Sequence, residues 1–320
     1  MSKYKEYAEK ATEFLALTGY THQEFEALLP QFRSRYYEWV SSHRLDGNRR
    51  GKRKYSDYKN SPLPTIEDKL LFILHYLKSN NLQTVQGALF GMSQPKANRW
   101  IHCLHPILNR TLADLGERPA RKMADVAFDL HEDALYFHDG TERPIQRPGD
   151  PEKQRDYYSG KKKHSVKNNV LTNILCKVLF LTDTVEGKRH DKKLADETEY
   201  TLPKGSKLAQ DTGFQGFKLD QVAILQPKKK PRGKELSDLE KDINQWHASI
   251  RVRIEHAIGG VKRYRIVKDK IRNWKTGFRD AVFETCCGLH NFRLNFPPLQ
   301  WFGHFFNFGP LFETRRHVTC

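Results

Sequence analysis

Residues 134–140 read ALYFHDG, and residues 206–213 read SKLAQDTG. In each stretch a short apolar run is followed by an aspartate and a glycine-containing turn, which predicts a β-strand that ends at Asp139 or Asp211. An α/β sheet presents groups to ligands at its strand ends, and a carboxylate there suits a hard divalent cation. If the two strands are neighbours, the two aspartates meet. The alternative is ordinary turn chemistry, because aspartate before glycine is common in turns.

The sequence around these two stretches predicts a mixed α/β domain. Further strands are expected from residue 165 onward, at 177–182 and at 223–225, with helices at 191–198 and from about 238 to 267. Strands that come first and then alternate with helices predict a mixed sheet with flanking helices. We place this domain at residues 119–295, followed by a phenylalanine-rich tail at 296–320.

The chain before residue 119 predicts helices only. Thr21 to Glu24 has the pattern of a capping box, and apolar residues then recur at helical spacing up to about residue 42. The basic stretch at 43–60 has little to bury, so we expect a loop or linker there. Residues 1–60 are therefore expected to form an N-terminal helical region with a basic linker.

Residues 61–118 have the pattern of a helix-turn-helix domain. A helix that begins near Ile66 is followed by a short helix that closes at Gly91 and by a longer helix capped by Ser93. Polar side chains at the start of this longer helix would face outward and contact DNA: Gln94, Lys96, Asn98 and Arg99. The alternative is an ordinary three-helix bundle.

The composition favours a polyanionic partner. The 320 residues include 55 Lys and Arg but only 38 Asp and Glu, a net charge of +17 that points to DNA, RNA or an acidic membrane. No apolar run is long enough to span a membrane, and the charged N-terminus lacks a signal core. Five cysteines without CxxC spacing argue against a zinc site, and glycine-rich nucleotide loops are absent. We expect a cytoplasmic, nucleoid-associated protein without a membrane partner or a nucleotide cofactor.

A third candidate acidic residue lies on the long C-terminal helix. Residues 247–263 read HASIRVRIEHAIGGVKR, in which isoleucines and a valine have the spacing of one buried stripe. Arg251, Glu255 and Lys262 lie on a common side that borders this stripe. Glu255 can therefore reach inward to a metal ion, or it can form an ordinary surface pair with Arg251.

Five motifs occur in one order: HDGTERPIQRP from residue 138, GKKKHSVKNNV from 160, EGKRHD from 186, QDTGFQG from 210 and RVRIEHAIGGVKR from 251. Together with the helix-turn-helix pattern upstream, they resemble the DDE transposases of bacterial insertion sequences, specifically the insertion-sequence-five and PIF/Harbinger-like group. The resemblance covers about residues 60–295, most of the chain.

This resemblance implies a ribonuclease-H-like fold with an acidic triad, Asp139, Asp211 and Glu255, that is both catalytic and metal-binding. The implied cofactor is a pair of Mg²⁺ ions, for which Mn²⁺ can substitute. The implied reaction is cleavage and strand transfer of double-stranded DNA, both at terminal inverted repeats and at a target. A homodimer or larger synaptic assembly is also implied. The tyrosine of a related family signature is replaced here by Ala248, which weakens only a tyrosine-mediated DNA contact.

Further basic and polar residues are candidate DNA contacts. The HxxKN element of the resemblance comprises His164, Lys167 and Asn168, and Lys163 directly precedes it. These four residues are candidate DNA contacts, and the alternative is that they form a polar strand face. The long helix gives Arg251 and Lys262. A basic run is a further candidate for contact with the DNA backbone, and the alternative is a solvated loop. It consists of Lys228, Lys229, Lys230, Arg232 and Lys234. Asp191 matches the HD segment of the family, although helix capping also explains it, and Glu142 and Asp183 are treated as non-ligands. Trp246, Trp274 and Trp301 are expected in the core.

Two other functions are compatible with parts of this pattern. A related nuclease could cut DNA without joining it, and the triad does not distinguish that activity from transposition. A non-catalytic DNA-binding protein would use only residues 61–116, but the acidic motifs argue against it. An RNA-binding protein is disfavoured because aromatic RNA-recognition motifs are lacking.

Overall fold

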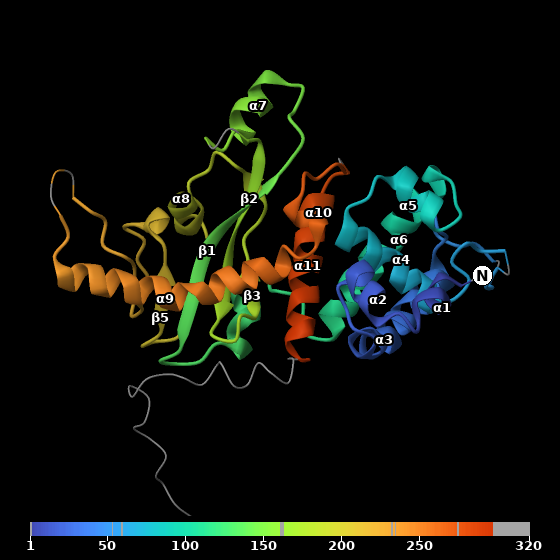
Figure 1. Ribbon diagram of the computed structural model, residues 1–320, viewed down its shortest axis with the longest axis horizontal. Coiled ribbons are helices and arrows are strands. Elements are labelled where there is room, and N and C mark those ends of the chain that lie inside the picture. Colours follow the sequence, from blue (N-terminus) through green and yellow to red (C-terminus); the bar gives the residue numbers. More distant parts are fainter. Residues whose placement is uncertain are drawn as a thin grey trace, which may run out of the picture.

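The computed structural model describes residues 2–296 apart from residues 53, 59, 161–162, 232, 234 and 274. Figure 1 shows a group of helices from the N-terminal half beside a sheet with its own helices. Within the described residues, no helix is both long enough and apolar enough to cross a membrane. Several of the sequence predictions lie outside these residues, namely those for Arg232, Lys234, Trp274, Trp301 and the tail from residue 297 onward.

The N-terminal region forms α1 (Lys3–Tyr7), α2 (Ala11–Thr18) and α3 (His22–Ser42). The predicted capping box at the start of α3 is confirmed. The Glu24 backbone N–H donates to the Thr21 hydroxyl, and the Thr21 backbone N–H donates to the Glu24 carboxylate. The expected linker packs partly onto α3, because the hydroxyl groups of Tyr36 and Tyr55 lie 3.0 Å apart.

The predicted helix-turn-helix is formed by α4 (Ile66–Ser79), α5 (Gln83–Leu89) and α6 (Gln94–Asp114). Gly91 has a φ of +65°, a conformation that glycine adopts without strain, and it lies two residues beyond Leu89, the last residue of α5. The turn that follows packs tightly on α5, since a Cβ on Gly87 would lie 2.6 Å from the carbonyl oxygen of Met92. Ser93 holds the N-cap position of α6, as predicted, but makes no side-chain capping bond.

One mixed sheet is present in the described part of the chain. Its strands are β1 (Leu135–Pro144), β2 (Ser165–Asn173), β3 (Val178–Leu181), β4 (Val185–Glu186), β5 (Lys207–Gln210) and β6 (Ala223–Leu225). They run in the order β3-β2-β1-β5-β6, with β4 paired to β2. β1 is antiparallel to β2 and parallel to β5. Because helices flank this sheet, the predicted ribonuclease-H-like α/β class is confirmed.

The remaining helices are η1 (Met123–Asp129), α7 (Pro151–Tyr157), α8 (Asp191–Asp196), η2 (Thr212–Phe214), α9 (Asp238–Val261), α10 (Arg265–Lys268) and α11 (Phe278–Leu294). α9 lies across β1 and β5 (Figure 1), with Ile254 buried against Phe137 and Ala209. The prediction of one helix up to residue 267 is wrong at its end. Tyr264 leaves the helical conformation, with ψ at 109°, and buries its ring in the core.

Two further sequence predictions are wrong. Asp139 does not end its strand, because β1 continues to Pro144 through its pairing with β2; only the parallel ladder with β5 stops at His138. Trp246 is not a core residue, since it is 49% exposed. It belongs to the N-terminal half of α9, where Leu239 and Ile243 are exposed as well.

The helical part and the sheet share one hydrophobic core. The largest cluster of buried side chains includes residues of α3, α4, α6, β3 and α11. Tyr20 donates its hydroxyl to the Leu289 carbonyl at 2.8 Å, and the Asn109 amide donates to the Thr285 hydroxyl at 2.9 Å. α11 therefore ties the N-terminal helices to the sheet although it comes last in the described chain.

Candidate active site

Asp139 and Asp211 each follow the last residue pair of the parallel ladder between β1 and β5. His138 and Gln210 are opposite each other in the parallel ladder, so the next residue of each segment lies at the same edge. One oxygen of each carboxylate is held by the backbone. The Gly140 N–H donates to Asp139 Oδ1 at 2.8 Å, and the Gly213 N–H donates to Asp211 Oδ1 at 2.8 Å. The structure thus brings these two predicted residues together.

The charge of this aspartate pair is only partly compensated. Burial, and then the negative charge of Asp211, raise the pKa of Asp139 to about 6. The Arg251 guanidinium opposes this shift, with Nη2 3.9 Å from Asp139 Oδ2. Adjacent carboxylate oxygens that repel each other are the donor set that a hard divalent cation stabilises. The pair therefore fits Mg²⁺ chemically.

Glu255 is placed differently from the two aspartates. It is exposed on α9, one helical turn beyond Arg251. Nowhere in the described part of the chain do three His, Cys, Asp or Glu side chains form a group that could hold a metal ion. The structure thus assembles two members of the expected triad, and the role of the third stays a prediction.

Asp191 is a carboxylate whose role the sequence left open. It does not cap α8, because the N-cap position is His190, and its Oδ1 lies 3.0 Å from Lys167 Nζ. A Cβ on Gly140 would lie only 2.3 Å from this Oδ1, and a Cβ on Gly213 would lie 3.4 Å from Oδ2. Asp191 also contributes to the raised pKa of Asp139. The sequence motifs around Asp139 and Asp211 do not signal this contact, because Asp191 lies in a separate segment of the chain.

The HxxKN residues differ in their access to solvent. Lys163 is exposed and His164 is half-buried, whereas Lys167 and Asn168 are buried on β2. Lys167 donates to the Arg189 carbonyl at 2.9 Å, in addition to its ion pair with Asp191. Asn168 donates to the Thr182 carbonyl at 2.8 Å and contacts Arg143. Lys167 and Asn168 therefore bind other groups of the protein in this structure. These contacts fit a role in positioning the segments around the aspartate pair.

The predicted DNA-contact residues of α6 lie at its exposed start. Gln94, Lys96 and Arg99 are exposed and Asn98 is half-buried. The amide groups of Gln94 and Asn98 both donate to Gln83 Oε1, at 2.7 and 3.0 Å. Gln83 begins α5, so these bonds fix the two helices of the motif to each other while Lys96 stays on the surface.

Two of the three described lysines in the basic run before α9 are paired with acidic residues. Lys228 forms an ion pair with Glu240, and Lys230 forms one with Glu235. Lys229 is exposed between them. A contact of this run with DNA stays a prediction, and these two pairs would have to open for Lys228 and Lys230 to contribute.

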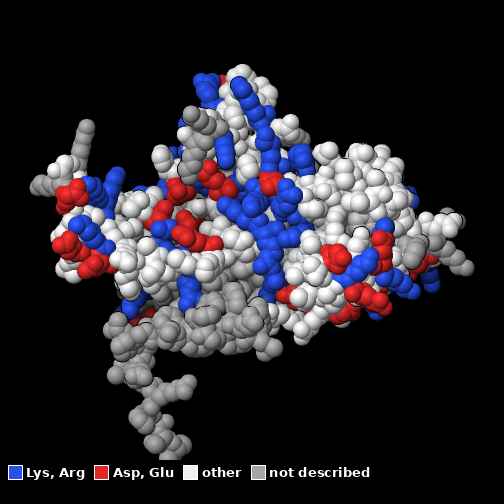
Figure 2. All heavy atoms as spheres, viewed as in Figure 1, with Lys and Arg blue, Asp and Glu red and all other residues white. Residues whose placement is uncertain are grey.

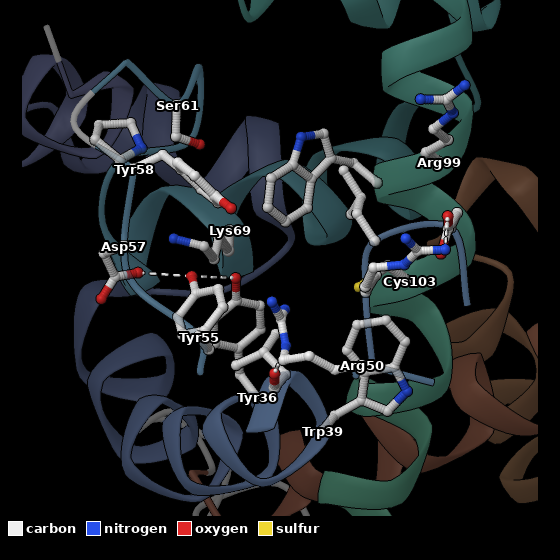
Figure 3. A pocket seen from close by; sticks show the side chains of 16 residues that line it. Tyr36, Trp39, Arg50, Tyr55, Asp57, Tyr58, Ser61, Lys69, Arg99 and Cys103 are labelled. Atoms are coloured by element: carbon white, nitrogen blue, oxygen red, sulfur yellow. Dashed lines mark hydrogen bonds and ion pairs between the residues drawn. The ribbon is translucent and has the colours of Figure 1, made fainter. Parts of the chain in front are cut away.

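A pocket of about 290 Å³ lies between α3, α4, α6 and the linker (Figure 3). Lys69 is buried at its wall and donates to the Leu63 carbonyl at 2.9 Å, with its ammonium 5.1 Å from the centre of the Tyr36 ring. Burial lowers the pKa of Lys69. Arg99 also lines this pocket. The N-terminal region and the linker therefore share a surface with the helix expected to contact DNA.

Comparisons with known proteins agree with this arrangement. "Probable transposase for insertion sequence element IS702" of Microchaete diplosiphon is 25% identical over 238 residues, which are 73% of this chain and 82% of that protein. "Putative transposase for insertion sequence element IS112" of Streptomyces albus G is 24% identical over 207 residues, 64% of this chain and 72% of that protein. No solved structure matches the chain.

Two family models match the chain where the structure has its sheet and its helix-turn-helix. Residues 138–291 match the DDE superfamily endonuclease, and residues 61–114 match the helix-turn-helix of the DDE superfamily endonuclease. The first range begins beside Asp139 and ends in α11, and the second contains α4, α5 and α6. The chain therefore contains a DDE superfamily endonuclease domain, preceded by the helix-turn-helix domain of the same superfamily.

Proposed function

We propose that this endonuclease is a transposase that binds the terminal inverted repeats of a DNA element, cleaves DNA at their ends and joins the freed strand to a target. The observation that carries the proposal is the aspartate pair at the edge of the β1–β5 ladder, with Arg251 beside it. The names of the two relatives, which both describe transposases of insertion sequences, support it.

The reaction needs two phosphoryl transfers at one site. In the first, water attacks a phosphodiester at the end of the element, and the bond to the 3′ oxygen breaks, which leaves a 3′-hydroxyl. In the second, this hydroxyl attacks a phosphodiester of the target and displaces its 3′ oxygen. Because one phosphodiester bond replaces another, the joining step needs no nucleotide cofactor.

In this proposal one set of residues binds the metal ions and another set binds the DNA. Asp139, Asp211 and Glu255 would hold two Mg²⁺ ions, or Mn²⁺ in their place, and the bound ions would supply charge to the attacking and leaving oxygens. Arg251 is close enough to Asp139 to offset part of the carboxylate charge while the pair is free of cations. The exposed start of α6 would read the repeats, and two protein copies would pair two ends.

The proposal is tested by DNA cleavage and joining with purified protein. The substrates are labelled duplexes from the DNA that flanks the coding sequence on each side, incubated with Mg²⁺ or with EDTA. The wild type should give cut and joined products only with Mg²⁺, and Asp211→Asn should give neither while it still binds the duplexes.

The two alternative functions predict different products. A nuclease without strand transfer would cut the ends but would not join ends that are supplied already cut. A DNA-binding protein without catalysis would bind the ends and give no product with Mg²⁺ or Mn²⁺, even from precut ends. The first result would overturn the proposed strand transfer, and the second would overturn the proposed catalysis.

A further inference from the structure

Residues 262–273, which we call the bridge segment, read KRYRIVKDKIRN and connect α9 to the loop before α11. The segment contains six Lys and Arg and one acidic residue, Asp269, which pairs with Arg265 at 2.8 Å. The apolar residues Tyr264, Ile266, Val267 and Ile271 are buried. The cations between them are exposed, namely Arg263, Arg265, Lys268, Lys270 and Arg272.

One side of the bridge segment is fixed to the helix-turn-helix domain. Lys78 donates to the Arg263 carbonyl at 3.3 Å, and the Asn80 amide donates to the Lys270 carbonyl at 3.5 Å. The Arg272 guanidinium in turn donates to the Asn80 carbonyl. These contacts reach the end of α4, directly before the short helix α5.

The other side of the bridge segment is fixed to the strand that carries Asp139. The Ile271 N–H donates to the Pro144 carbonyl at 3.0 Å, and Ile271 forms a parallel β-bridge with Ile145. Pro144 is the last residue of β1, five positions after Asp139. At the rise of a β-strand this separation is about 17 Å, which is comparable to about five base steps of duplex DNA.

The bridge segment includes α10, which lies at the junction of the helical part and the sheet (Figure 1). Figure 2 shows Lys and Arg gathered in a band over the junction of the helical part and the sheet, beside a group of acidic residues on the sheet. A hollow of about 410 Å³ opens at this junction, lined by Asn81, Leu82 and Val85 on one side and by Arg265, Lys270 and Arg272 on the other. Its walls thus come from both domains.

We infer that the bridge segment is a binding surface for the phosphate backbone of duplex DNA and that it guides the strand from the helix-turn-helix to the aspartate pair. This inference rests on the proposed function, since it assigns a path to the DNA on which that function acts. The contacts on both sides fix the backbone that carries these cations before DNA arrives, so little loop ordering is needed on binding.

The test is the salt dependence of DNA affinity. The variant carries Lys268→Gln and Lys270→Gln, whose side chains are exposed, and the probe is a random-sequence duplex titrated at several salt concentrations. Each lost phosphate contact should reduce the slope of log affinity against log salt by about 0.9, so the pair should reduce it by about 1.8. The matched control is Lys204→Gln with Lys207→Gln, two exposed lysines at the opposite end of the β1–β5 ladder, which should leave the slope unchanged.

The outcomes separate this inference from the proposed function. A wild-type slope in the bridge variant, or an equal loss in the control variant, would overturn the bridge segment as a specific surface while the transposase proposal stands. Wild-type protein that does not bind duplex DNA at all would overturn both. Unchanged thermal unfolding of both variants would show that charge, and not folding, has been altered.

Discussion

Gly140 shows how a neighbouring side chain, and not the backbone conformation, can require a glycine. Aspartate before glycine is common in turns, but neither Gly140 nor Gly213 has a positive φ. Instead, Gly140 leaves room for the Asp191 carboxylate, whereas a Cβ on Gly213 would lie closest to Asp211 Oδ1, at 2.9 Å. No sequence pattern within either motif could reveal this contact, because Asp191 comes from α8, far from both glycines in the chain.

Gly140→Ala should disturb the site directly. The added Cβ would lie 2.3 Å from Asp191 Oδ1, so the carboxylate or the strand must move. We expect a loss of about 1–3 kcal/mol in the free energy of unfolding. DNA cleavage should fall by about 100-fold, since small misplacements of catalytic groups are costly. Urea unfolding and the cleavage assay measure these two effects.

A double-mutant cycle with Asp191→Ala provides the control. If the clash with Asp191 is the cause, Gly140→Ala should cost much less when Asp191 is already alanine. The coupling free energy is then about 1–3 kcal/mol, as for other residues in contact. Additive effects of the two substitutions would contradict this explanation.

At the scale of elements, the sequence predicts best what is determined locally. The helix starts at Thr21 and Thr65 are set by hydrogen bonds within four residues. The predicted capping box at Thr21 is present, and the predicted helix start near Ile66 has a capping box as well, between Thr65 and Asp68. The strands that lead to Asp139 and Asp211 were also predicted, because their apolar runs are short and bounded by turns. The two aspartates are expected to be adjacent if their strands are neighbours, and the resemblance, which places both in one acidic triad, supports that expectation.

Other features depend on partners that are distant in the sequence. β1 continues beyond Asp139 because β2 pairs with it, and α9 ends early because Tyr264 is buried in the shared core. For the same reason the sequence does not decide between the two explanations for Asp191, since Lys167 and Gly140 approach it from other elements. Helical and strand periodicity within one element carries no information about such contacts.

Gly87 tests the geometry of the helix-turn-helix. In Gly87→Ala the new Cβ would lie 2.6 Å from the Met92 carbonyl oxygen, a backbone atom that cannot rotate away. We expect a loss of about 1–3 kcal/mol in the free energy of unfolding, and weaker binding of DNA because the start of α6 is displaced. Urea unfolding and DNA titration measure the two effects.

Gly259→Ala is the matched control for this substitution. Gly259 lies on the exposed side of α9, and an added Cβ would meet no atom within 4 Å. The free energy of unfolding should therefore rise by about 0.5–1 kcal/mol, the gain in helix propensity. Equal stability of the wild type and Gly87→Ala would show that the turn does not pack as closely as described.

For the whole molecule, α11 is the element on which the two domains depend. Arg143 on β1 is fully buried and donates to the Arg279 carbonyl at 2.6 Å, with its guanidinium 4.3 Å from the centre of the Phe283 ring. On the opposite side, α11 contacts α6 through Asn109 and His105. One helix therefore connects strand β1 to the helix expected to contact DNA.

His105 makes the stability of this junction dependent on pH. Burial, and then the charge of His102, lower the pKa of His105 to about 4, and its Nε2 lies 3.0 Å from the Thr285 hydroxyl. The unfolded chain takes up this proton near pH 6.5, so between pH 6.5 and 4 the unfolded state holds more protons. The free energy of unfolding should therefore decrease as the pH falls through this range, by up to about 3 kcal/mol from this group.

The substitution His105→Asn removes this titration. The difference in the free energy of unfolding between pH 6.5 and pH 4 should be smaller in the variant than in the wild type, whatever its stability at neutral pH. Urea unfolding across this range measures both differences. Equal pH dependence in the two proteins would mean that the buried imidazole is not the group responsible.

The shared core also has a consequence for protein engineering. Residues 61–114 look like a separable cassette in the sequence, yet α11, at residues 278–294, supplies part of the surface on which they fold. A chimera that exchanged only the N-terminal half would leave the foreign helices against a mismatched α11. To redirect such an enzyme to a new DNA sequence, the designer would have to transplant two distant stretches of the gene together or retain the buried face of α6 and change only its exposed residues.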